Sequence, residues 1–64
     1  MFIELTDDRG FVCLVNVDNI STVFGSEDGC TLNLRTKGSM RVQESYEKVK
    51  ELLIQNGFIK KLST

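Results

Sequence analysis

The sequence predicts an α+β fold: an antiparallel meander of four or five strands, with one C-terminal helix packed on one face of the sheet. Over residues 1–43, short runs alternate apolar with polar residues, which is typical of strands. Turns rich in glycine and aspartate separate these runs. Residues 45–56 alone repeat apolar residues at helical spacing. With 64 residues, the chain is expected to form a single domain, 1–64.

The strand runs follow one another with short connections. They cover residues 1–6, 11–17, 20–24, 30–35 and 39–43. Asp18-Asn19 separates the second run from the third and is predicted to form a short helical turn. Because every connection is short, we expect each strand to pair with its neighbour in sequence.

The helix has both a start and a stop in the sequence. Tyr46, Val49 and Leu53 form its apolar stripe. Ser45 can accept a hydrogen bond from the first turn and is the expected N-cap. Gly57 tolerates a positive φ angle and is expected to end the helix.

One helix is ~10 Å wide, about two strand spacings, so it cannot cover a five-stranded sheet. We expect it to lie over the side of the sheet that carries four apolar residues: Leu32, Leu34, Met40 and Val42. Phe2, Phe11 and Leu14 then stay uncovered, as does Val12, and large exposed apolar groups on a small domain indicate an interface. The alternative is that strong sheet twist buries these residues within the chain.

Composition favours self-association as a source of extra buried surface, because a chain this short buries only ~60% of its unfolded surface. A zinc site is not expected, since structural zinc normally takes four Cys or His ligands and the chain has two cysteines and no histidine. Cys13 and Cys30 lie in apolar runs and are expected to be buried free thiols, although a disulfide between them is geometrically conceivable. No signal sequence or membrane-spanning run is recognisable, so the sequence indicates a cytoplasmic protein without a membrane partner.

The charge distribution differs between the two halves of the chain. Residues 1–34 hold one basic and six acidic side chains, whereas residues 35–64 hold seven basic and three acidic ones. Such asymmetry suggests an anionic partner or head-to-tail pairing of copies, and ordinary solubilising charge is the simpler reading. The candidate nucleic-acid contacts are the basic residues Arg35, Arg41, Lys60 and Lys61.

Residues that would support catalysis are not arranged in any familiar pattern. The adjacent carboxylates Asp7 and Asp8 lie in a turn and are expected to point apart, which does not suit a general acid and base. No phosphate-binding glycine loop or calcium loop is present. We therefore expect a protein that is not an enzyme, with no catalytic residues, no metal site and no cofactor.

Three segments occur in a recognisable order. Residues 15–20 read Val-Asn-Val-Asp-Asn-Ile, residues 29–35 read Gly-Cys-Thr-Leu-Asn-Leu-Arg, and residues 40–49 read Met-Arg-Val-Gln-Glu-Ser-Tyr-Glu-Lys-Val. This order resembles the small bacterial and phage proteins of the FlbD-like type, mainly through the pattern around Val42, Glu44, Ser45 and Val49. The resemblance implies a small accessory protein without catalytic residues.

A second, partial resemblance covers residues 20–63. Phe58, Ile59 and Lys60 match the opening of a Phe-x-Arg-x-His-Arg-Ser motif. This motif belongs to the LytTR DNA-binding domain, which the segment resembles and in which His-Arg-Ser contacts DNA. In this chain Leu62, Ser63 and Thr64 occupy the His-Arg-Ser positions. This resemblance implies a nucleic-acid-binding regulatory protein.

The sequence thus yields two functional hypotheses. The first is a non-enzymatic interaction or accessory module that forms a homo-oligomer, or binds another protein, through Phe2, Phe11 and Leu14 or through an open strand edge. The second is a nucleic-acid-binding protein that uses its basic C-terminal half.

Overall fold

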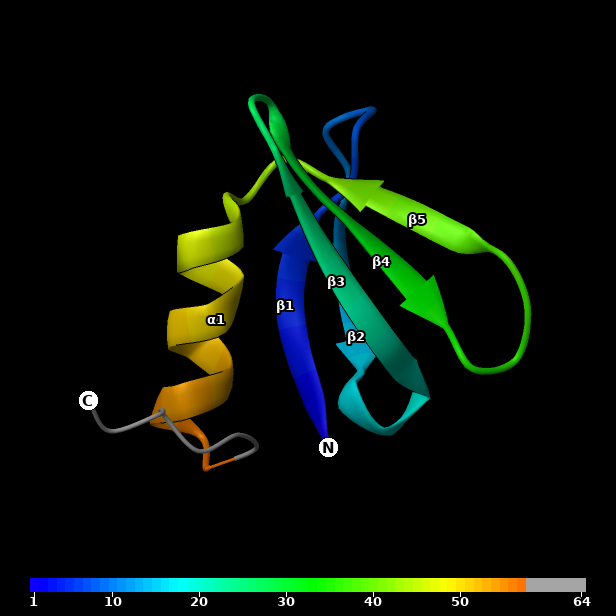
Figure 1. The fold of residues 1–64 in the computed structure, drawn as a ribbon, viewed down its shortest axis with the longest axis vertical. Helices are drawn as coiled ribbons and strands as arrows, with labels where there is room; N and C mark the ends of the chain where they lie inside the picture. Colours follow the sequence, from blue (N-terminus) through cyan, green and yellow to red (C-terminus); the bar gives the residue numbers. More distant parts are fainter. Residues whose placement is uncertain (58–64) are drawn as a thin grey trace.

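The computed structural model describes residues 1–57 and contains five strands, a short 3-10 helix and one α-helix (Figure 1). In chain order these are β1 (Phe2–Thr6), β2 (Val12–Asn16), the 3-10 helix η1 (Val17–Asn19), β3 (Ile20–Ser26), β4 (Gly29–Leu34), β5 (Ser39–Val42) and α1 (Tyr46–Gln55). All strand pairs are antiparallel. The predicted α+β class, with one C-terminal helix, is confirmed.

The strands form two sheets, β1-β2 and β3-β4-β5, within which each strand pairs with its sequence neighbour as predicted. The expected meander breaks at one connection, because β2 and β3 are not paired. At this point the Asn16 side chain accepts the Asp18 N–H at 3.1 Å, which starts η1, the predicted short helical turn. The main-chain N–H of Ile20 then bonds to Val17 O and ends it.

The two sheets meet where β1 ends beside β5. Asp7 and Val42 form an antiparallel bridge, and the Gln43 N–H donates to Thr6 O at 2.8 Å. The carboxylate of Glu44 accepts the Thr6 N–H with both oxygens, at 2.8 and 3.0 Å. In Figure 1 the chain passes from this junction directly into α1. The junction therefore ties the β1–β2 hairpin, β5 and the start of the helix to one another.

The core lies between the two sheets and α1. Its buried side chains are Ile3, Leu5, Val15, Cys30, Leu32, Val42, Val49 and Leu53. The helix runs alongside β3 (Figure 1). Of the residues expected beneath the helix, Leu32 and Val42 are buried, whereas Leu34 and Met40 are half-buried. The helix thus completes the core from the β3 side.

Both predicted ends of α1 are confirmed. The hydroxyl of Ser45 accepts the Lys48 N–H at 3.1 Å, so Ser45 is the N-cap. Gly57 has φ +78°, and its N–H donates to Ile54 O at 3.0 Å. Neither helix within residues 1–57 combines the length and apolar character needed to cross a bilayer.

Candidate self-association surface

Three large apolar side chains project from the outer face of the β1–β2 hairpin. Phe2, Val12 and Leu14 are 61%, 64% and 66% exposed. The register pairs Leu14 with Glu4 and places Phe2 one step away on the diagonal, within reach of an aromatic side chain. We call Phe2, Val12 and Leu14 the hairpin patch. Two of the three residues that the sequence singled out as an interface, Phe2 and Leu14, thus lie together.

The strand β2 carries this patch at a free sheet edge. The Asp7 N–H donates to Phe11 O, and the Val17 N–H donates to Met1 O, so the odd-numbered residues around β2 point their main chain at β1. Val12 and Leu14 therefore point their N–H and C=O groups away from β1. Within residues 1–57, no strand other than β1 pairs with β2. Such an edge is a template for pairing with another strand.

The third predicted interface residue, Phe11, lies at the turn before β2. It is 63% exposed and one residue out of phase with Val12 and Leu14, so it does not belong to the hairpin patch. The guanidinium of Arg9 lies 5.2 Å from the centre of its ring, within the range of a cation–π contact. Phe11 thus extends the apolar surface at the other face of β2.

Asp7 organises this turn through its side-chain hydrogen bonds. Its Oδ1 accepts the N–H groups of Arg9 and Phe11, each at 2.9 Å, and its Oδ2 accepts from Arg9 Nη2 at 3.0 Å. The Phe11 N–H, and then Arg9, lower the pKa of the Asp7 carboxyl. A carboxylate held in this way remains ionised and stabilises the turn through these hydrogen bonds.

The two cysteines are free thiols that differ in exposure. Cys30 is buried in the core, and Cys13 on β2 is half-buried. Loss of solvation raises the pKa of both thiols, and the charge of Glu44 adds to the rise in each. Asp7 adds a further increase at Cys13. Both thiols therefore stay protonated at neutral pH, which suits small apolar residues.

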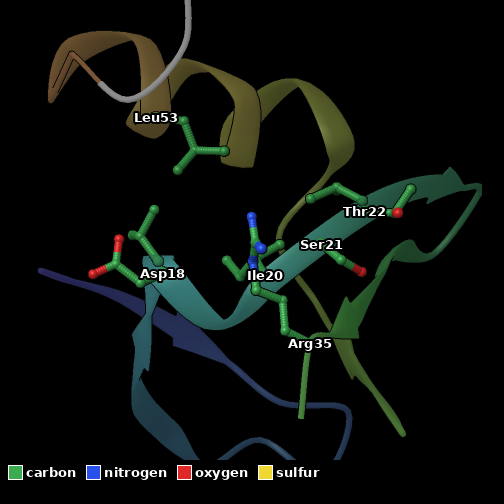
Figure 2. A pocket seen from close by; sticks show the side chains of 8 residues that line it. Asp18, Ile20, Ser21, Thr22, Arg35 and Leu53 are labelled. Carbon is green, nitrogen blue, oxygen red and sulfur yellow. The ribbon is translucent and has the colours of Figure 1, made fainter. Parts of the chain in front are cut away.

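A concave feature, which the sequence did not reveal, lies between β3 and α1. An open pocket of about 540 Å³ is lined by Val17, Asp18, Ile20, Ser21, Thr22, Val23, Arg35 and Leu53. Figure 2 shows Leu53 projecting from α1 toward Ile20, with Arg35 and Asp18 on the sheet side. The Ser21 hydroxyl donates to Asn33 O at 3.2 Å. The main chain of the neighbouring strand β4 therefore holds the Ser21 hydroxyl.

Of the predicted basic residues, Arg35 and Arg41 lie within the described part of the chain and are not adjacent. Arg41 lies on β5 opposite Thr31, whereas Arg35 follows β4, four residues beyond Thr31, or about 13 Å along a strand. Lys60 and Lys61 lie outside the described residues, as do the other LytTR-like positions after Gly57.

Phe24 is an exposed residue that sequence reasoning missed. It is 56% exposed and pairs with Thr31, which in turn pairs with Arg41, so the three side chains share one row across the outer face of the sheet. A register shift between Ile20 and Thr22 decides which face of β3 carries Phe24. Strand alternation alone could not place this bulge, although Phe24 itself was visible as an aromatic residue in a strand.

Within the described part of the chain, no three potential metal ligands gather. Comparisons with protein-family models, curated protein sequences and solved structures find no match to this chain.

Proposed function

We propose that this chain is a non-enzymatic interaction module that self-associates through the hairpin patch and the free edge of β2. The observation that carries the proposal is the coincidence of the two features on one strand. Val12 and Leu14 expose their side chains, and the same residues turn their main-chain hydrogen-bonding groups away from β1. A partner strand there gains main-chain hydrogen bonds and apolar contacts at the same time.

The size of the chain supports a second copy as the partner. A short chain gains buried surface from association that its own core does not supply. The core of residues 1–57 takes Ile3, Leu5 and Val15 from the hairpin, so every large apolar side chain on its outer face remains for a partner.

Sedimentation equilibrium between about 10 μM and about 1 mM protein tests the proposal, because self-association follows mass action. We expect the average mass to rise with concentration for the natural sequence and to stay at one chain for Leu14→Glu. Phe24→Glu is the matched control, because it places the same charge at an exposed apolar site on β3 and should leave association unchanged. A single-chain mass for the natural sequence throughout this range would refute the proposal.

Nucleic-acid binding is the second candidate, and the row of Phe24, Thr31 and Arg41 favours it. An aromatic ring beside an arginine on a sheet face can stack on a base while contacting the phosphate backbone. The formal net charge of −1 weakens long-range attraction to a polyanion. Fluorescence anisotropy with labelled single-stranded DNA at low salt tests this candidate. We expect Phe24→Ala and Arg41→Ala each to weaken binding, and no binding by the natural sequence would discard it.

A further inference from the structure

We propose that two copies pair their β2 strands antiparallel about a two-fold axis at Cys13, so that Val12 of each copy lies opposite Leu14 of the other and β1-β2 becomes a four-stranded sheet. This inference rests on the proposed self-association and specifies its partner, a second copy, and its register. A two-fold axis uses the same strand from both copies and requires the paired strands to run in opposite directions.

Main-chain geometry limits the possible registers. Only the even-numbered residues of β2, such as Val12 and Leu14, point their N–H and C=O groups to the free edge. A hydrogen-bonded pair across the new edge must therefore join an even-numbered residue to another even-numbered residue. Axes at Val12, Cys13 or Leu14 satisfy this condition.

Side-chain matching selects the axis at Cys13. In that register Val12 lies opposite Leu14 on the outer face, and Phe11 lies opposite Val15 on the inner face. All five pairs from residue 11 to residue 15 are then apolar. An axis at Leu14 places Val12 opposite the polar Asn16, and an axis at Val12 places Leu14 opposite Gly10. The axis at Cys13 thus covers two of the most exposed apolar residues, Phe11 and Leu14.

Disulfide trapping tests the register. Across the axis the two Cys13 side chains lie opposite each other at a non-hydrogen-bonded position, where Cβ atoms are about 4.5–5.5 Å apart, close to disulfide geometry. Diamide at pH about 9 supplies the oxidant, because the thiolate is the reactive form. The two thiols form one S–S bond, and their two electrons and two protons pass to the azo group of diamide. We expect a disulfide-linked dimer on a non-reducing gel for the natural sequence.

Two variants serve as controls. Cys13→Ala keeps Cys30 and should give no linked dimer, because Cys30 is buried within its own chain. Cys13→Ala combined with Leu14→Cys tests the axis at Leu14. In the proposed register the two Cα atoms at position 14 are about 8 Å apart, too far for a disulfide.

The outcomes separate this inference from the proposed function. Concentration-dependent mass together with linkage through Cys13 supports both. Concentration-dependent mass without Cys13 linkage, or with linkage only in the position-14 variant, overturns the register but leaves self-association standing. A single-chain mass at every concentration, without linkage, overturns both.

Discussion

Tyr46 packs directly against the bare backbone of Gly25. A Cβ atom built on Gly25 would lie 2.9 Å from the Tyr46 Cβ, closer than real Cβ atoms approach a neighbour, and 3.3 Å from its Cγ, tighter than most such contacts. Gly25 lies on β3 and Tyr46 is the first residue of α1, so this contact fixes the distance between the helix and the sheet. Gly25 does not adopt a positive φ angle, so the constraint is one of space.

We expect Gly25→Ala to lower the free energy of unfolding by about 1–3 kcal/mol, the usual cost of forcing extra atoms into a packed site. Urea unfolding followed by circular dichroism measures the change. In a Tyr46→Gly background, the cost of Gly25→Ala should fall by at least half, because the Cβ, Cγ and Cδ1 atoms that crowd the site are then absent. Equal costs in the two backgrounds would show that Tyr46 is not the constraint.

Gly29 should tolerate a side chain far less well than Gly38. Both have positive φ angles, +138° and +81°, but a Cβ on Gly29 would lie 2.1 Å from Val42 O, whereas a Cβ on Gly38 would meet nothing within 4 Å. We expect Gly38→Ala to lower the free energy of unfolding by about 1–2 kcal/mol, because alanine is strained at a positive φ angle. Gly29→Ala adds a clash with the β5 backbone, so it should cost at least about 3 kcal/mol or prevent folding. Thermal unfolding compares the two, and similar midpoints would contradict this account.

Glu44 should matter through its hydrogen bonds to Thr6. Glu44→Ala leaves the partly buried Thr6 N–H without its acceptor, and we expect a loss of about 1–3 kcal/mol in the free energy of unfolding. The matched control is Glu27→Ala, because Glu27 is an exposed carboxylate in the β3–β4 turn. Its effect should stay within about 0.5 kcal/mol. Equal effects of both variants in chemical denaturation would rule out this role for Glu44.

The Asp7 carboxylate should make stability depend on pH in the acid range. Its pKa is lowered in the folded chain, so the unfolded chain binds the proton more tightly. The stabilisation is complete above the unfolded pKa of about 3.9 and is lost as the pH falls through the lower folded value. Thermal unfolding from about pH 6 to about pH 2 should show a smaller acid-induced drop for Asp7→Asn than for the natural sequence. An identical pH profile would show that the turn does not depend on this charge.

The sequence was sufficient for features set by nearby residues. The helix depends on the repeat of apolar residues at helical spacing. Its N-cap depends on the Ser45 hydroxyl, which accepts a hydrogen bond from the main-chain N–H three residues later. The turn at Asp18 follows from a polar interruption between two apolar runs. Exposure of Phe2 and Leu14 was expected from the width of a single helix, but in the structure it arises because both residues lie on the face of the β1–β2 hairpin that points away from the core.

Features set by distant residues were beyond sequence reasoning. Strand propensity could not predict the bridge between Asp7 and Val42, because no local sequence pattern links the two positions. The missing β2–β3 pairing was equally hidden, because the strands on either side of η1 belong to different sheets. The placement of Arg35 beside a pocket depends on how β3 and α1 pack against each other, which the sequence also could not predict.

The Asp7–Val42 bridge also has a consequence for the order of folding. It joins positions that are 35 residues apart, and closing a loop of that length costs about 3 kcal/mol of chain entropy. The hairpin of β1 with β2 and the ladder of β3, β4 and β5 each require only short loops, so each can nucleate independently. We therefore expect docking of these two units to limit the folding rate, so that substitutions at the bridge slow refolding more than they accelerate unfolding.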